Sequence, residues 1–405
     1  MAFDLHVLSE TGVDLVNRVA PVRFARAVTG ATNKRAPDID DRGFEVAPAF
    51  GSARGPVVAV MKRKTIRVQV IRDRVEATTP LFVSTDDDTI ARIEHPAADA
   101  ALDPNDIAET DATPERKGDC IYIHGASTSR RSQETIVRVH FGAADGPVIA
   151  ELAVRVLPIL VVNVQAHSVA INTANQAITN IGMLRSLFRR VNHIYAQAGV
   201  YFRLSSNLLQ ERVNGFARND TVTLTATADS RNNELQTVLN QNPRANHLNA
   251  YFIRNYVDVV PSPPDVNGVL GIAFSTIQAN ANPPAGAFPG TQAGITARID
   301  PDARMLSDTV AHEIGHALTL NHTRLRGDSN EPGDVQSYRT MMYFETGLTG
   351  SINIDQIGYG RLADGTRTNG TLIWTKRWRG WRESDQANRI RRAVLGRRYA
   401  PVRVP

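Results

Sequence analysis

The stretch Asp308-Thr-Val-Ala-His-Glu-Ile-Gly-His-Ala-Leu-Thr-Leu-Asn-His322 decides how the C-terminal half of this chain of 405 residues is interpreted. On an α-helix, four residues turn the chain by roughly 400°, so His312 and His316 lie about 40° apart on one face. Two imidazoles placed in this way can hold one Zn²⁺ ion at about 2.0–2.1 Å from each ring nitrogen. Glu313 lies roughly 100° further round the helix, where its carboxylate can reach a water molecule beside the metal without binding the metal.

The opposite side of this predicted helix is apolar. Measured from His312, four apolar side chains fall in one stripe between roughly 120° and 240°; they are Leu306, Val310, Ile314 and Leu318. The helix is therefore expected to bury this stripe in the core and to present its histidines to a cleft.

His322 is the candidate for a third metal ligand, and its role depends on where the helix ends. Because it lies six residues after His316, a continued helix would point its ring about 240° away from the metal. It becomes a ligand if the helix ends between residues 317 and 321 and the chain turns back. The sequence leaves downstream carboxylates open as alternative ligands, namely Asp328, Glu331, Asp334 and Glu345.

His-Glu-x-x-His with a further histidine six residues later resembles the metzincins, zinc endopeptidases with a methionine-containing turn beneath the metal. Downstream, Arg339-Thr-Met-Met-Tyr-Phe344 resembles this Met-turn. The resemblance implies that Met342 lies under the metal, with Met341 as the alternative. If Met341 takes that place, Tyr343 follows it by two residues, as does a tyrosine that approaches the metal in some metzincins.

The resemblance implies zinc as the cofactor and peptide-bond hydrolysis as the reaction. Three neutral histidines leave one zinc position for water, and zinc lowers the pKa of that water towards about 7. Glu313 is expected to take a proton from this water as a general base and to deliver it to the leaving amine. Tyr343 is a second catalytic candidate, whose hydroxyl would donate a hydrogen bond to the oxyanion; a core tyrosine of the turn is the other interpretation.

Thr319 departs from the metzincin pattern, which usually has glycine at this position. Glycine permits the left-handed backbone with which the chain leaves the helix, whereas a β-branched residue is disfavoured there. Asn321 tolerates such a conformation better than threonine does. Either the turn lies a residue or two away from Thr319, or His322 is not the third ligand.

The N-terminal part of the chain is predicted to be rich in β-strands. Between about residues 56 and 158, short β-prone runs alternate with turn-prone stretches, which is typical of an antiparallel sandwich. The runs are Val57–Met61, Ile66–Ile71, Pro80–Ser84, Thr89–Ile93, Cys120–Ile123, Thr135–Phe141 and Val148–Leu157. The segment from Ser84 to Ile93 and the long final run resemble bacterial immunoglobulin-like modules. Residues 1–55 show weak periodicity and are interpreted as an N-terminal extension.

From residue 159 the pattern changes to α/β. A continuous apolar strand at Ile159–Val164 precedes a helical pattern from Ile181 to Tyr195, which stops at Gly199. Further strands are predicted at Val200–Leu204, Leu248–Ile253, Val269–Ser275 and Ile295–Ile299. This order resembles the metzincin catalytic domain, in which an edge strand, here Val269–Ser275, pairs with extended substrate.

We therefore expect a multidomain chain, in which an all-β immunoglobulin-like sandwich is followed by an α/β zincin domain of metzincin type with a mixed sheet and an active-site helix. The expected divisions are an extension at 1–55, the sandwich at 56–158, the zinc peptidase domain at 159–360 and a basic segment at 361–405. A final helix is predicted from Ser384 to about Leu395, with Gly396 as its C-terminal stop.

Positive charge is concentrated at the C-terminal end. The formal net charge is +5, and residues 361–405 contain twelve Lys and Arg against three Asp and Glu, a local net charge of +9. This segment also contains Trp374, Trp378 and Trp381. An anionic partner that binds through charge and stacking is one interpretation. A packed segment with solvated arginines is the other.

The composition argues against several classes of protein. No apolar run reaches the ~18 residues of a membrane span, and the first residues lack the basic start and apolar core of a Sec-type signal peptide. We therefore expect a soluble protein that is cytoplasmic or exported without a cleaved signal. The one cysteine, Cys120, excludes an internal disulfide and a zinc ribbon.

Three functional hypotheses follow from these patterns. The leading one is a metalloendopeptidase that hydrolyses proteins or peptides with zinc and Glu313. The second is a binding or adhesion protein with a structural or inactive zinc site, which Thr319 favours. The third is an exported effector or toxin peptidase, which shares the chemistry of the first and differs in its delivery.

Overall fold

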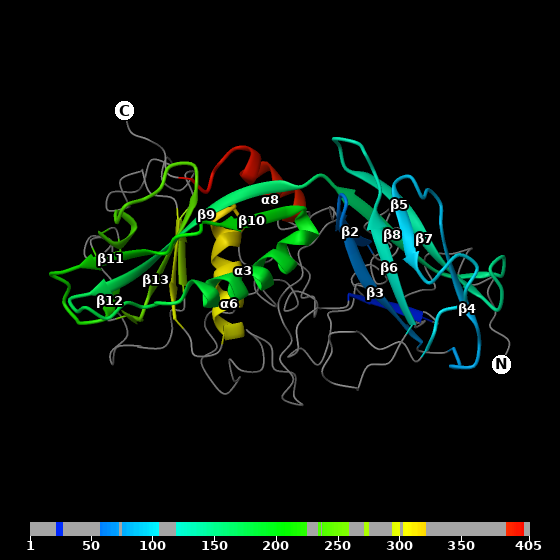
Figure 1. The fold of residues 1–405 in the computed structure, drawn as a ribbon, viewed down its shortest axis with the longest axis horizontal. Coiled ribbons are helices and arrows are strands. Elements are labelled where there is room, and N and C mark those ends of the chain that lie inside the picture. The colour runs from blue at the N-terminus through cyan, green and yellow to red at the C-terminus, as the bar shows by residue number, and fades with distance from the viewer. Residues whose placement is uncertain are drawn as a thin grey trace, which may run out of the picture. The chain divides into compact units, whose positions relative to one another are not determined.

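The computed structural model describes residues 22–26, 57–72, 75–104, 119–224, 234–235, 237–258, 271–274, 294–299, 303–320 and 386–400. Contacts divide the chain into two compact units, whose elements are labelled in Figure 1. The first unit contains Met1–Ile159, Ala196–Gly199 and Thr323–Asp385. The second contains Leu160–Tyr195, Val200–His322 and Gln386–Pro405.

The described part of the first unit is built from two four-stranded β-sheets. One is antiparallel throughout, with the order β1 (Val22–Arg26), β3 (Thr65–Arg72), β6 (Asp119–Gly125) and β5 (Ala91–His95). The other has the order β2 (Val57–Met61), β8 (Val148–Leu157), β7 (Gln133–Phe141) and β4 (Leu81–Thr85). In this second sheet β2 runs parallel to β8 and the other pairs are antiparallel. Both sheets contribute to one hydrophobic core, which includes Val68, Ile121, Val137 and Leu152.

Seven of these strands, β2 to β8, lie where the sequence predicts them, within two residues at each end. β1 was not predicted, because it is only five residues long and Arg23 and Arg26 interrupt its apolar residues. Val22 and Phe24 are buried. It comes from the predicted N-terminal extension and pairs with β3. The immunoglobulin-like assignment of this unit stays a prediction.

The second unit contains a mixed sheet with the order β10-β9-β13-β16-β15, and β11 pairs with a further stretch of β9. Its strands are β9 (Leu160–Ile171), β10 (Val200–Leu204), β11 (Leu209–Val213), β13 (Leu248–Ile253), β15 (Gly271–Phe274) and β16 (Gly294–Arg298). All pairs are parallel except β15 with β16, which is antiparallel and lies at the end of the sheet. A separate parallel pair is formed by β12 (Thr221–Leu224) and β14 (Asn255–Asp258).

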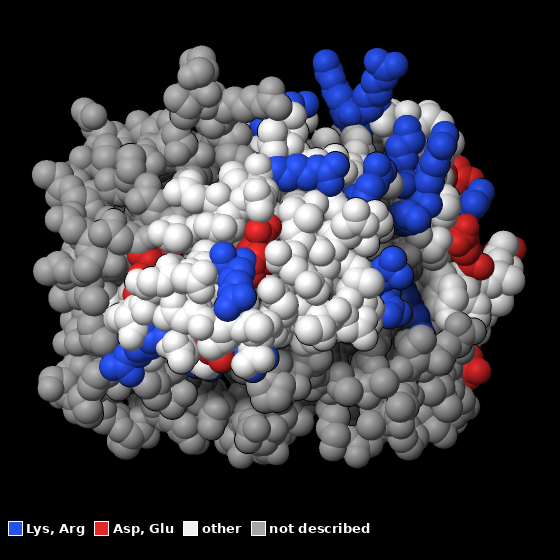
Figure 2. Space-filling view, turned by 60° about the vertical axis from the view of Figure 1, so that its left-hand side comes forward, with Lys and Arg blue, Asp and Glu red and all other residues white. Residues whose placement is uncertain are grey.

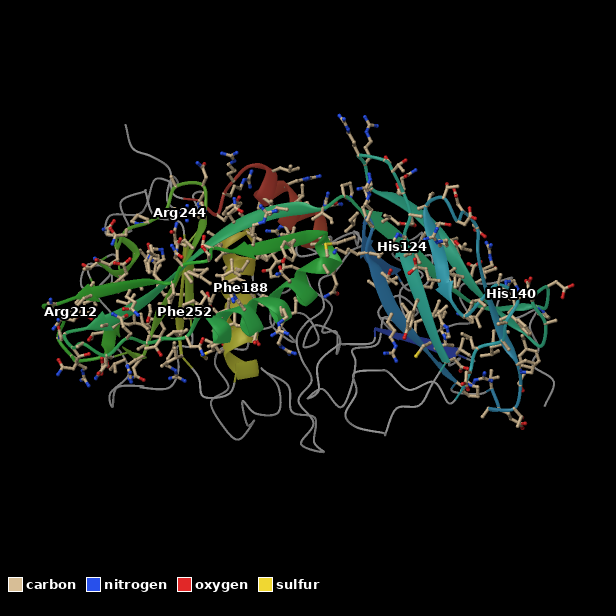
Figure 3. All side chains as sticks on the ribbon, viewed as in Figure 1. His124, His140, Phe188, Arg212, Arg244 and Phe252 are labelled. Carbon is tan, nitrogen blue, oxygen red and sulfur yellow. The ribbon has the colours of Figure 1, made fainter. Side chains whose placement is uncertain are left out.

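Two helices of this unit pack against each other, α3 (Ile181–Tyr195) and α6 (Ala303–Ala317). α3 begins where the side chain of Asn180 accepts a 2.7 Å hydrogen bond from the backbone N–H of Gly182, which caps the helix N-terminus. A 3₁₀ turn, η3 (Ala196–Ala198), follows it. The chain then leaves at Gly199, whose φ of 67° requires glycine's freedom, as the sequence predicts. Figure 3 labels Phe188 of α3 and Phe252 of β13, and both side chains are buried.

The last described helix, α8 (Gln386–Leu395), buries Ile390 and Val394. The helix ends at Leu395 as predicted, but Gly396 is not the left-handed residue of its C-terminal turn. The left-handed residue is Arg397, with a φ of 50°, and its N–H donates to Val394 while that of Arg398 donates to Ala393. This is a Schellman motif with arginine at the position that glycine usually takes. The predicted N-cap, Ser384, lies outside the described residues.

The C-terminal end of α6 has the same geometry at Thr319. Its φ is 71°, its N–H donates to the carbonyl of His316 at 2.8 Å, and the N–H of Leu320 donates to Gly315 at 2.9 Å. These two bonds define a Schellman motif in which Thr319 takes the left-handed position. Of the two alternatives that the sequence left open, a turn displaced from Thr319 is not observed, because Thr319 itself adopts the left-handed backbone. The role of His322 stays a prediction.

A contact from α8 stabilises this turn. The guanidinium of Arg389 donates a hydrogen bond to the carbonyl oxygen of Thr319. Arg389 is half-buried. A β-branched residue in the left-handed region costs roughly 1–2 kcal/mol, and a charge-assisted bond from a neighbouring helix offsets part of that cost.

None of the helices in the described ranges has the length and apolar character to cross a membrane. On the face shown in Figure 2, Lys and Arg side chains cover more of the surface than Asp and Glu side chains do. Areas of uncharged surface lie between them. The region of α8 contributes exposed cations at Arg392, Arg397 and Arg398. Trp374, Trp378 and Trp381 lie outside the described residues, so an anionic partner for residues 361–405 stays a prediction.

Thr319→Gly is expected to raise the free energy of unfolding by about 1 kcal/mol, because glycine adopts the left-handed backbone without steric cost. The matched control is Thr309→Gly, which places glycine in the interior of the same helix, where it costs about 1 kcal/mol. Chemical denaturation measures both. A loss of stability in both variants would contradict a strained Thr319.

Candidate metal centre

α6 is fixed in the core by an apolar face and by one buried hydrogen bond. The predicted stripe is fully buried, which confirms the interpretation of Leu306, Val310, Ile314 and Leu318. The hydroxyl of Tyr195, at the end of α3, donates to the carbonyl of Ala311 at 2.8 Å. Because Ala311 precedes His312 directly, this bond holds α6 where the candidate motif begins.

His312 and His316 bring their Nε2 atoms to 3.1 Å from each other. Their ring centroids are 4.7 Å apart and the rings are inclined by 82°. Two ring nitrogens that share a tetrahedral zinc ion at 2.0–2.1 Å lie about 3.3 Å apart. The separation in this structure therefore fits two ligands of one zinc ion.

The Nδ1 atom of His316 determines which tautomer its ring adopts. Its Nδ1 lies 2.9 Å from the carbonyl oxygen of Leu320. Because a carbonyl only accepts hydrogen bonds, Nδ1 carries the proton and Nε2 keeps its lone pair. Burial also lowers the pKa of His316, so the ring stays neutral near pH 7, as a metal ligand must be.

Glu313 lies next to this pair and is also buried, with 7% of its surface exposed. Burial raises the pKa of its carboxyl to about 8, because a low-dielectric environment disfavours the charged form. A nearby cation acts in the opposite direction and favours the carboxylate.

The expectation that the histidine face of α6 opens to a cleft stays a prediction. His312 is 3% exposed, and His316 is partly exposed. α6 packs against β15 and β16 as well as α3, and Glu313 contacts β15 at Gly271.

His322, Tyr343, Met341 and Met342 lie outside the described residues, as do the alternative ligands Asp328, Glu331, Asp334 and Glu345. Among the residues that the structure describes, no three His, Cys, Asp or Glu side chains come together as a metal site. The structure does place the end of α6 at Ala317 and a left-handed turn at Thr319. These are the conditions under which the sequence allows His322 to turn back towards the metal.

Two residues near the motif were not identified from the sequence. Tyr195 was read only as part of an apolar helical pattern, yet it anchors α6 through its hydroxyl. Gly271 of β15 lies directly against the side chain of Glu313. An isolated glycine within a predicted strand indicates a close approach of backbone to another group, and this signal was present in Val269–Ser275.

Other histidines near the motif have structural partners. His167 of β9 is fully buried, with Nδ1 3.2 Å from a carboxylate oxygen of Glu211 and Nε2 3.1 Å from the side-chain oxygen of Asn249. The Nδ1 of His247 lies 2.9 Å from the carbonyl of Ala245. Both rings therefore have hydrogen-bond partners of their own.

Comparison with solved structures gives only weak likenesses. A member of the MSP family from C. elegans shares 10% identity, with 25% of this chain and 91% of that chain covered and a TM-score of 0.16. A sialyltransferase from Photobacterium damsela shares 7% identity, with 50% of this chain and 35% of that chain covered and a TM-score of 0.18. TM-scores this low carry no argument about fold or function. A search of curated proteins found no match.

A family match covers the region of the candidate metal centre. Residues 183–323, about a third of the chain, match the metallo-peptidase family M12B, described as reprolysin-like. The matched residues contain all but the first two residues of α3, most strands of the mixed sheet, α6 and all three candidate histidines. This match supports a metallopeptidase domain of metzincin type in this part of the chain.

Proposed function

We propose that the chain is a zinc-dependent endopeptidase that hydrolyses peptide bonds in proteins or peptides. The observation that carries the proposal is the 3.1 Å approach of the Nε2 atoms of His312 and His316, beside the buried carboxyl of Glu313. The metallopeptidase family match over residues 183–323 supports it.

In this proposal His312 and His316 supply two zinc ligands and His322 supplies the third. The left-handed turn at Thr319 supports the choice of His322, because it ends α6 before that residue. Asp328, Glu331, Asp334 and Glu345 are the competing ligands. Met342, or alternatively Met341, lies beneath the metal.

When bound, zinc supplies Lewis acidity, which polarises a carbonyl group and makes a water molecule more acidic. Glu313 takes a proton from the attacking water and passes it to the leaving amine. The bond from His316 Nδ1 to Leu320 keeps the ligand ring in the tautomer that offers Nε2. Tyr343 donates a hydrogen bond to the developing oxyanion.

β15 supports a mode of substrate binding. Within the described residues it pairs on one side, with β16, and it lies at the end of the sheet. An extended peptide that added to its other side would be held by backbone hydrogen bonds. Because α6 packs against β15, that peptide would run close to Glu313.

One observation favours a second candidate function. The ligand His312 is almost completely buried, which fits a closed, structural zinc site. The chain would then be a binding protein in which zinc stabilises the second unit. An exported effector peptidase would use the same chemistry as the main proposal. It differs only in how the protein is delivered, so export of the protein is what would distinguish it.

His316→Ala is expected to abolish stoichiometric zinc binding, with a loss in affinity of more than about 100-fold, because even indirect support of a ligand contributes about 10–100-fold. Competition with a chromophoric chelator measures the affinity. His247→Ala is the matched control and is expected to bind zinc as the wild type does, since its ring bonds to a nearby carbonyl.

The third ligand is identified by the same measurement. His322→Ala should weaken zinc binding as strongly as His316→Ala, while alanine at Asp328, Glu331, Asp334 or Glu345 leaves it unchanged. A carboxylate variant that loses zinc, with His322→Ala unaffected, would replace His322 in the ligand set.

Glu313→Ala is expected to keep zinc and to lose activity by at least about 10²–10⁴-fold, which is the usual contribution of a general base. Cleavage of casein by the zinc-loaded proteins measures the loss. Full activity in this variant would rule out the mechanism. Stoichiometric zinc binding with no cleavage by the wild type would favour the structural site.

A further inference from the structure

Gly271 of β15 lies so close to Glu313 that a Cβ atom at this position would require the glutamate side chain to move. A Cβ atom at this position would lie 2.5 Å from Cγ of Glu313, and 2.9 Å from both its Cδ and its Oε1. Contacts of this length are not made by real Cβ atoms. Gly271 is not among the described glycines with positive φ, so space rather than backbone conformation requires glycine here.

The backbone on the helix side of this contact is fixed. α6 is anchored by the bond from Tyr195 to Ala311 and by the buried stripe that includes Val310 and Ile314. Glu313 lies between these two residues on the same helix. The Cα of Glu313 therefore has no freedom to withdraw from β15, and a clash would have to be relieved at the side chain.

The strand side is fixed as well. Gly271 is paired with Ala297 of β16. Its neighbour Ile272 accepts a 3.3 Å hydrogen bond from the Oγ1 of Thr296, and that hydroxyl is also hydrogen-bonded to the buried Tyr256. The backbone of β15 is thus tied to β16 at the point where it crosses Glu313.

We propose that Gly271 is a positioning residue for Glu313: the absence of a side chain at this point of the edge strand lets the glutamate lie against the strand backbone beside His312. A methyl group at position 271 would rotate the carboxyl away from the two histidines. The close contact between Gly271 and Glu313 does not depend on the proposed function. The effect of that contact on catalysis rests on the proposed function.

Melting temperatures of Gly271→Ala in three backgrounds test the spatial part. With Glu313 present, the variant is expected to melt about 5 °C lower, because the added methyl overpacks a filled site. With Glu313→Gln, which has the same shape, the loss should be similar. With Glu313→Ala, the space is vacated and Gly271→Ala should cost nothing or raise the melting temperature.

An equal loss in all three backgrounds would overturn the inference, because the glycine would then be needed for some other reason. If Gly271→Ala does not fold on its own, the double variant with Glu313→Ala decides the question. A folded double variant supports the contact, and an unfolded one contradicts it.

Zinc affinity and steady-state kinetics test the catalytic consequence. Gly271→Ala is expected to bind zinc as the wild type does, because neither histidine is touched. Its kcat should fall by about 10²-fold, the effect of misplacing a reacting group by about 1 Å, with KM little changed. A wild-type kcat together with the predicted coupling in melting temperature would mean that displacing Glu313 does not matter, which contradicts the positioning role.

The two proposals fail in different ways. If the wild type binds zinc but cleaves no peptide, while the coupling between positions 271 and 313 is present, the proposed function fails and the contact stands. If the wild type cleaves peptides and Gly271→Ala is neutral in every measurement, the inference about Gly271 fails and the peptidase stands.

Discussion

The hydrogen bond between Nδ1 of His316 and the carbonyl of Leu320, at 2.9 Å, links the chemistry of the candidate site to the end of a helix. The carbonyl is available because α6 stops at Ala317 and Thr319 turns the chain to the left. The ring of His316 consequently carries its proton on Nδ1 and directs the lone pair of Nε2 towards His312. A helix that continued past residue 317 would occupy the Leu320 carbonyl within the helix and point His322 away from the site.

The burial of Glu313 is the second physical feature of this site. The side chain of Glu313 extends from α6 and lies against β15, and burial raises the pKa of its carboxyl to about 8. A carboxyl in such surroundings responds strongly to a neighbouring cation, since electrostatic interactions are larger where water is excluded. The same packing requires a strand with no side chain at residue 271. α6 and the edge strand β15 therefore pack closely where Gly271 meets the side chain of Glu313.

Local patterns predicted much of this structure. The 3.6-residue period predicted the buried stripe of α6 and the extent of α3, and β-prone runs predicted seven strands of the first unit. Long-range partners were not predictable in the same way. β9 continues to Ile171 past the end of its apolar run because buried polar residues such as His167 find partners 44 and 82 positions away, at Glu211 and Asn249. β11 and β12 were missed because each contains polar residues that are buried by tertiary pairing, Glu211 in β11 and Thr221 and Thr223 in β12. β14 was missed because it is only four residues long and begins and ends with polar residues.

The backbone at Thr319 shows where statistical preference and structure diverge. Threonine is disfavoured in the left-handed region, so its presence at the glycine position of metzincins argued for a shifted turn. In the structure the turn lies at Thr319. A hydrogen bond from Arg389 of α8, 70 residues further along the chain, offsets part of the cost of the left-handed backbone. A preference of 1–2 kcal/mol is small enough for one such tertiary contact to offset, and the sequence around Thr319 gives no sign of that contact.

X-ray absorption at the zinc edge, recorded on the purified zinc-loaded chain, tests the central claim most directly. The account predicts a single tightly bound zinc ion with three imidazole nitrogens and one oxygen from water, at about 2.0–2.1 Å. A coordination shell of four protein side chains would contradict the peptidase and identify a structural site. A shell with fewer than two imidazoles would contradict the metal centre itself.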